Sequence, residues 1–245
     1  MPDLRSVLAF AAPSLNQLVF LALVLWLGGP YAPAVRLPRP KLLHLEIVVV
    51  FVLVFLANAW RESVMARGRP EPDLTIAMNA LLATTLALPP LLQLLRRRPL
   101  SELGIAPIAN WRSTPLLSVW IGIYVLGALL YRPSAGLPMT VHLERVAPIA
   151  VGLLGEELAF RGFIQTRLEL GYGLPAAWIV SSVFFGLVHV ANAFASGPAG
   201  LLAPLPTFAL GLLWGATFAK TRSLFVVWPA HAAYDLIGGG LLFGR

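Results

Sequence analysis

Long apolar runs constrain the fold of this chain more than any other feature. A helix that crosses a bilayer needs about 20 mostly apolar residues, and about eight runs reach that length. Hydrophobic residues make up 58% of the 245 residues and charged residues only 12%, whereas soluble domains carry about 25% charged residues. We therefore predict an all-α integral membrane protein, a bundle of about eight transmembrane helices near residues 6–29, 42–60, 74–95, 115–131, 147–167, 174–194, 200–219 and 224–243.

The runs predict a single membrane domain over residues 1–245, with the first four spans in residues 1–131. Links in that first part are long, basic and rich in proline, as in "RESVMARGRPEPD". The last four spans are joined by the short links "LELGYG", "ASGP" and "KTRS", which favour antiparallel neighbours that pack tightly.

The formal charge of +7 comes from Lys and Arg residues that lie mostly between the apolar runs. Basic residues in such links set membrane orientation and contact lipid headgroups, so the pattern indicates the lipid bilayer as a partner rather than nucleic acid. The chain contains no cysteine, which excludes disulfides, thiol nucleophiles and cysteine-zinc sites.

Ionisable residues inside the predicted spans lie almost entirely in the C-terminal half of the chain. The stretch "GEELAFRGF" at 155–163 places two carboxylates and a guanidinium in an otherwise apolar run. A charge at the bilayer centre costs from about 2.5 kcal/mol upward, so such groups usually face a cavity and serve a function. The pattern predicts one shared active site, built from Glu156, Glu157, Arg161, His189, Asn192, His231 and Asp235.

Helical spacing gives these residues different partners. Glu157 and Arg161 are four residues apart, so they share a helix face and can neutralise each other. Glu156 points about 100° away from Glu157 and has no such partner. His231 and Asp235 are also four apart, so a carboxylate can orient the imidazole or share its proton.

One carboxylate and two histidines allow hydrolysis by a general base. Glu156 would take a proton from a water that His189 also holds, and His231 with Asp235 would donate to the oxyanion formed on a carbonyl. Glu156, His189 and His231 could instead ligate zinc with one open position. Neither an H-E-x-x-H helix nor a G-x-S-x-G elbow is present, which argues against a zincin-type metalloprotease and against a serine nucleophile elbow.

Structural interpretations compete with each of these roles. Glu157 and Arg161 could be a buried ion pair that serves only stability. His189 could bridge two helices, and His231 with Asp235 could form an interfacial pair near the start of the last span. Glu156 is hardest to explain in this way, because a free carboxylate in a membrane is either protonated or placed for chemistry.

Three motifs in order resemble those of a known family. The chain reads "EELAFR" at 156–161, "FGLVH" at 185–189 and "HAAYD" at 231–235. These match the E-E-x-x-x-R, F-x-x-x-H and H-x-x-x-N/D motifs of the CAAX prenyl protease type II family, also called the CPBP family. The resemblance covers about residues 145–240, a CPBP-like catalytic core, and spans 1 to 3 are only compatible with it.

The resemblance implies an eight-helix intramembrane endopeptidase that cleaves a membrane-associated protein or peptide, of the prenylated CAAX type in part of the family. It implies that Glu156 and His189 activate water, that His231 and Asp235 form the oxyanion hole, and that Glu157 and Arg161 hold the site. Phe185, one turn before His189, would wall the same cavity. The family has been described both as zinc metalloproteases and as metal-free, glutamate-dependent enzymes, and the residues leave both open.

We therefore expect a protease in a bacterial cytoplasmic membrane. A non-enzymatic immunity or scaffold protein is a second hypothesis, and a proton-coupled transporter is a third, because Glu and His chains also relay protons. The absence of a detectable internal repeat argues against the transporter.

Overall fold

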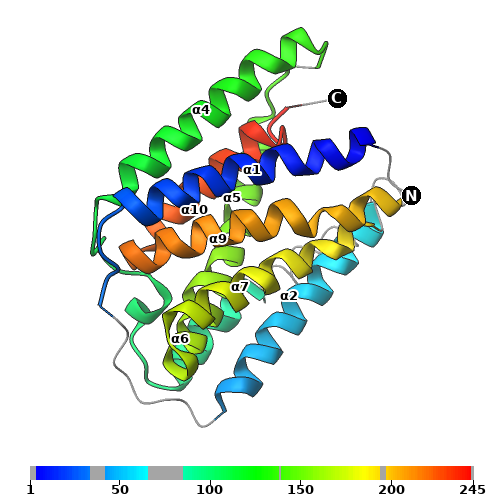
Figure 1. Ribbon diagram of the computed structural model, residues 1–245. Helices are drawn as coiled ribbons and strands as arrows, with labels where there is room; N and C mark the ends of the chain where they lie inside the picture. The colour runs from blue at the N-terminus through cyan, green and yellow to red at the C-terminus, as the bar shows by residue number, and fades with distance from the viewer. Residues whose placement is uncertain (1–3, 34–41, 66–84, 138, 194–196, 244–245) are drawn as a thin grey trace.

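The computed structural model describes residues 4–33, 42–65, 85–137, 139–193 and 197–243, and within these ranges the chain is helical apart from loops and one isolated β-bridge (Figure 1). The α-helices are α1 (Leu4–Leu27), α2 (Leu43–Met65), Thr85–Leu95, α4 (Ser113–Ser134), α5 (Val146–Glu157), α6 (Thr166–Tyr172), α7 (Leu174–Val188), α9 (Pro204–Thr221) and α10 (Leu224–Ala233). Two π-helical segments, η3 (Leu158–Gln165) and η6 (Tyr234–Gly238), continue α5 and α10.

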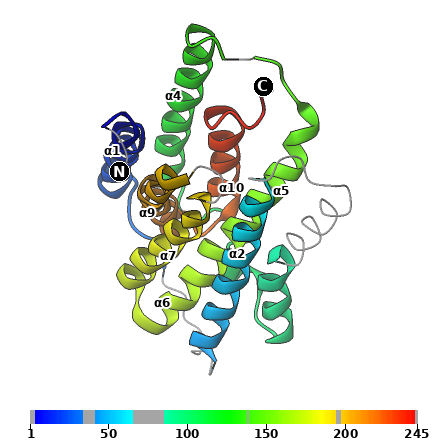
Figure 2. The ribbon, with the colours of Figure 1, turned by 90° about the vertical axis from the view of Figure 1, so that its right-hand side faces the viewer.

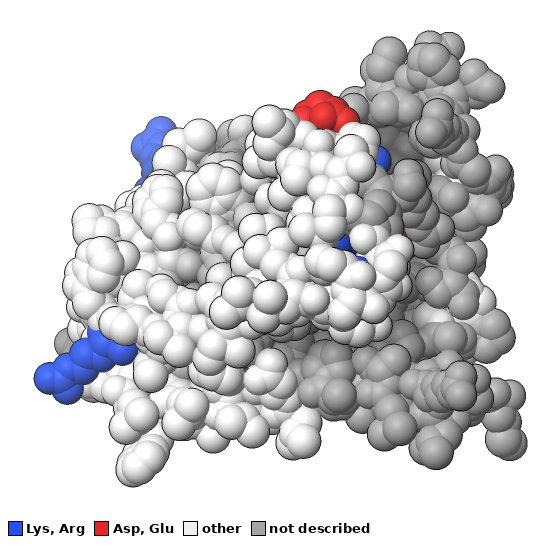
Figure 3. All heavy atoms as spheres, turned by 90° about the horizontal axis from the view of Figure 1, so that it is seen from above, with Lys and Arg blue, Asp and Glu red and all other residues white. Residues whose placement is uncertain are grey.

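The all-helical membrane fold expected from the sequence is confirmed. Among the described residues, four helices are long and apolar enough to cross a membrane, namely Leu43–Val64, Ser113–Ser134, Leu174–Asn192 and Gly200–Thr221. On the face that Figure 3 shows, the described surface is mostly uncharged, as a bilayer requires. The full count of eight spans stays a prediction, and residues 74–84 of the third span lie outside the described residues.

Helix α9 forms the centre of the bundle. It packs most extensively on α7 and α1, which lie on either side of it in Figure 1. Glycines permit the close approach to α7, because a Cβ at Gly211 would lie 3.1 Å from Ser182 Cα and one at Gly215 would lie 2.8 Å from Trp178 Cδ1. Small residues at helix contacts are the usual device for packing inside membranes.

A regular α-helix was expected through the "GEELAFRGF" stretch, but the structure differs there. The segment from Leu158 to Gln165 is π-helical, and all eight of its residues are buried. π-Helical turns are rare and are found often at functional sites. Tertiary contacts hold this wide turn, since the Ser181 hydroxyl of α7 donates to the Phe160 carbonyl at 2.8 Å.

Gly162 allows η3 to contact the backbone of the preceding loop. A Cβ at this position would lie 2.6 Å from the Leu103 carbonyl oxygen, which a side-chain rotation cannot relieve. We expect Gly162→Ala to lower the free energy of unfolding by about 1–3 kcal/mol through overpacking. Thermal unfolding in detergent tests this, with Gly122→Ala as control because a Cβ there meets no atom within 4 Å. Equal losses in the two variants would contradict the packing argument.

Arg167 is an exception to the expectation that basic residues outside the span interiors contact lipid headgroups. It is only 1% exposed and makes ion pairs of 3.2 Å with both Glu46 of α2 and Glu102 of the loop before α4. The Gln93 side chain accepts a further hydrogen bond from it. This cluster ties α6 to α2 and to the Thr85–Leu95 helix, so its charges serve the fold.

Candidate active site

Glu157 lies at the centre of a buried polar group. Its Oε1 accepts a hydrogen bond from His231 Nδ1 at 2.7 Å, and its Oε2 lies 3.4 Å from Arg161 Nε. Exposed fractions of these three residues are 2% or less. The structure therefore contains the predicted Glu157–Arg161 pair and adds a link to His231 across 74 positions of sequence.

Asp235 approaches the opposite side of the His231 ring. Its Oδ2 lies 3.7 Å from His231 Nε2, so this imidazole has a carboxylate near each nitrogen. The Asp235 side chain is 29% exposed, whereas that of His231 is 3% exposed. Asp235 also lies within electrostatic range of Glu156 and His189.

Glu156 is half-buried, while its neighbour Glu157 is fully buried. It lies within electrostatic range of Arg161, His231 and Asp235. Arg161 is therefore near both glutamates, although only Glu157 forms an ion pair with it. Glu156 thus differs from Glu157 in burial.

His189 ends α7 with a defined ring orientation. Its Nδ1 lies 2.8 Å from the Phe185 carbonyl oxygen, which can only accept, so Nδ1 carries the proton. In the neutral ring Nε2 is then an acceptor. Asn58 of α2 donates from Nδ2 to the Val188 carbonyl at 2.9 Å and holds the backbone just before His189.

Phe185 contacts most of the site. Its ring meets those of His189 and His231 edge-on, with centroids 5.2 and 5.9 Å apart. The Arg161 guanidinium lies over the same ring, 4.0 Å from its centroid. One aromatic side chain therefore keeps the two imidazoles apart and packs against the buried cation.

An aromatic support behind His231 was not predicted from the sequence. Trp214 of α9 lies 5.8 Å from the His231 ring, and Tyr234 lies in a T-shaped contact with Trp214 at 6.5 Å. Gln17 of α1 donates to the Tyr234 hydroxyl at 3.2 Å. A signal was present, since Gln17 and Asn58 are polar residues inside apolar runs, but they carry no charge.

Two predicted elements of the site lack support. Asn192 lies at the end of a 3₁₀ turn that begins at His189, and among the described residues no hydrogen bond joins its side chain to the site, so its role stays a prediction. The zinc arrangement of Glu156, His189 and His231 also lacks support, since the described residues contain no group of three His, Asp or Glu side chains close enough to hold a metal ion. The metalloprotease alternative therefore has no ligand set among these residues.

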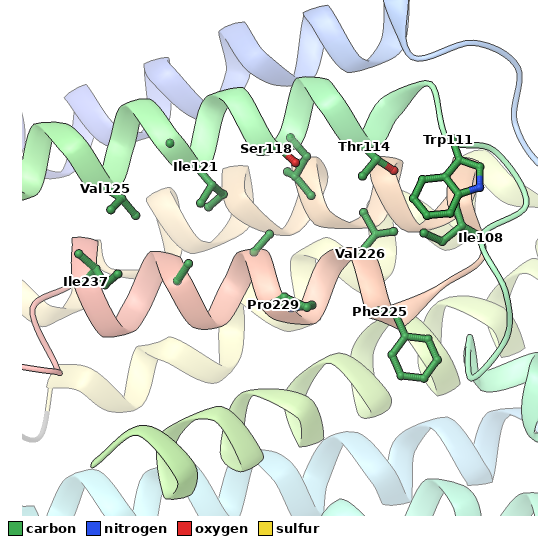
Figure 4. Close-up of a pocket in the computed structure, with 14 residues that line it drawn as sticks. Ile108, Trp111, Thr114, Ser118, Ile121, Val125, Phe225, Val226, Pro229 and Ile237 are labelled. Carbon is green, nitrogen blue, oxygen red and sulfur yellow. The ribbon is translucent and has the colours of Figure 1, made fainter. Parts of the chain in front are cut away.

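An apolar groove of about 590 Å³ lies between α4 and α10 (Figure 4), and His231 is not among its lining residues. Its lining comes from both helices and from the loop before α4, and it includes Trp111, Thr114, Ile121, Phe225, Pro229 and Ala233.

Residues 140–237 match the model of a protein family described as Type II CAAX prenyl endopeptidase Rce1-like. The match confirms the resemblance to this family that the three motifs predicted. No match was found among curated proteins or among solved structures.

The family assignment indicates a membrane-embedded protease that acts on a protein substrate. The match covers about two-fifths of the chain and includes every residue of the three motifs. Helices α1, α2 and α4 precede it, so Gln17 and Asn58 reach the Rce1-like segment from outside.

Proposed function

We propose that this protein is an intramembrane endopeptidase that hydrolyses a peptide bond of a membrane-associated, CAAX-type substrate through a water activated by Glu156 and His189. The observation that carries the proposal is a buried His231 that binds Glu157 through Nδ1 and faces Asp235 at Nε2, with the Phe185 ring in contact with both His231 and His189. Hydrolysis of an amide needs a base, a second water ligand and an oxyanion donor, and these residue types supply all three.

In the proposed reaction Glu156 takes one proton from water while His189 Nε2 accepts the other hydrogen as a hydrogen bond. The water oxygen attacks the carbonyl carbon, and the electron pair of the C=O bond moves to its oxygen. When that tetrahedral species collapses, the C–N bond breaks and Glu156 returns the proton to the leaving amine. The products are a new carboxyl terminus and a new amino terminus.

His231 suits the role of oxyanion donor. Its Nδ1 is engaged by Glu157, so only Nε2 is available to a substrate. Nε2 can donate only when the ring carries both protons, and that ring would have a carboxylate at each nitrogen. Glu157 and Asp235 therefore support the protonated form that the oxyanion role requires.

Asp235→Asn tests how the last motif residue acts. Asp235→Asn removes one of the two carboxylates beside His231, but Glu157 still supports the protonated ring and the new amide can itself donate to the oxyanion, so we expect the substitution to keep or raise the cleavage rate. Initial rates of the two forms in the assay below measure this. A complete loss of cleavage would assign Asp235 to the orientation of His231 instead.

The assay uses the purified full chain in detergent and a quenched fluorescent peptide that ends in a farnesylated C-a-a-X sequence. Cleavage that depends on Glu156 is the expected result. Because detergent micelles carry no ion gradient, such cleavage also excludes a proton-coupled transporter. If neither this peptide nor any membrane protein in cells is cleaved, the result would contradict the protease and favour the scaffold hypothesis. A bacterial cytoplasmic membrane as its location stays a prediction.

A further inference from the structure

The Asp235 carboxylate depends on its backbone for position. Among the described residues no side chain donates a hydrogen bond to it, and its distance of 3.7 Å from His231 Nε2 is longer than a hydrogen bond. Asp235 lies within the π-helical segment η6, between Tyr234 and Gly238. Whatever holds η6 therefore also sets the distance between Asp235 and His231.

Tyr124 of α4 contacts η6 on both sides of Asp235. Its ring stacks on that of Tyr234 with centroids 4.3 Å apart and an angle of 14°, and the two hydroxyls interact. A Cβ at Gly238 would lie 1.8 Å from Tyr124 Cε1, so the absence of a side chain there lets the phenol approach the backbone. Tyr124 also interacts electrostatically with Asp235 itself.

The surroundings make this contact the main link between α4 and the end of the catalytic helix. Figures 2 and 4 show α4 beside α10, and the apolar groove separates much of the two helices. Helix α4 packs more extensively on η6 than on α10. Trp120, one turn before Tyr124, adds a second stacked contact with Tyr234 at 5.7 Å.

We propose that Tyr124 is a positioning residue that holds η6 and so keeps Asp235 in place against His231. The inference rests on the proposed function for its catalytic meaning. Tyr124 lies outside the residues that match the family, so the N-terminal half would contribute directly to the geometry of the site.

A thiol probe tests the positional claim without any substrate. The chain contains no cysteine, so Asp235→Cys introduces a single thiol whose reaction rate with N-ethylmaleimide reports the exposure of η6. We expect Tyr124→Ala to raise this rate about fivefold or more by loosening the segment. Tyr124→Phe keeps the stacked ring and should restore most of the protection. Ile123→Ala is the matched control, because Ile123 is the preceding residue and is 57% exposed.

A cleavage assay tests whether the position matters for catalysis. Tyr124→Ala should lower kcat about tenfold to a hundredfold with little change in KM, since small displacements in a site have effects of that size. In an Asp235→Ala background, Tyr124→Ala should lower kcat by less than about twofold. Tyr124 is proposed to act through Asp235, and that carboxylate is already absent. An unchanged labelling rate in Tyr124→Ala overturns the proposal, as does an equal loss of kcat in both backgrounds. Absence of cleavage by the wild type counts against the proposed function alone, since labelling still decides the position of η6.

Discussion

Glu156→Gln is expected to abolish proteolysis and to leave the fold intact. The substitution keeps the shape of the side chain but removes the base that takes the proton from water, which lowers a rate by about 10²–10⁴-fold in general acid–base catalysis. Glu156 is half-buried, and among the described residues its side chain makes no hydrogen bond or ion pair. Initial rates of peptide cleavage in detergent measure the loss.

Thermal unfolding of the same preparation is the control. We expect Glu156→Gln to unfold within about 2 °C of the wild type, because substitutions away from packing and buried networks cost little. A variant that cleaves at more than about a tenth of the wild-type rate is incompatible with Glu156 as general base.

Glu157→Gln is expected to lower the stability of the fold strongly, whereas Glu156→Gln is expected to leave it almost unchanged. Glu157 is fully buried and holds both Arg161 and His231, so the substitution leaves a buried guanidinium without its carboxylate. Breaking a buried ion pair by removing one partner costs about 3–5 kcal/mol. For a chain of this size that corresponds to a fall in the unfolding temperature of about 6–20 °C.

The adjacent glutamates make a matched pair for this test, because the same substitution is made in the same helix one residue apart. Adding Arg161→Met to Glu157→Gln removes the unpaired charge and should recover part of the lost stability, but not the activity. If Glu157→Gln and Glu156→Gln unfold at the same temperature, the buried bridge contributes nothing to the fold.

The helices and the Glu157–Arg161 pair were predictable because they depend on local features. Apolar runs fix the helical segments, and a spacing of four residues places two side chains on one face. The convergence of three motifs was predictable from the cost of isolated charges in a bilayer. These features could be predicted without the packing of helices that lie far apart in the sequence.

The π-helical geometry of η3 was not predictable from its residues. It depends on contacts such as Gly162 against the Leu103 carbonyl and Ser181 with the Phe160 carbonyl, which arise only when the loop before α4 and helix α7 are in place. The bond between Glu157 and His231 was missed for the same reason, since it spans 74 positions. Tyr124 was also not predicted from the sequence, because its proposed role depends on stacking and not on charge.

The central claim is that this chain cuts proteins in the membrane with Glu156 as its base. The most direct measurement compares the peptide termini of the membrane proteome in cells that carry wild type with cells that carry Glu156→Ala at equal expression. We predict a set of termini that is present with the wild type and vanishes with the variant, and those termini would identify the substrate and the bond that is cut. Identical termini in the two cell lines, with a variant that still supports the cellular phenotype, would contradict proteolysis and favour a scaffold.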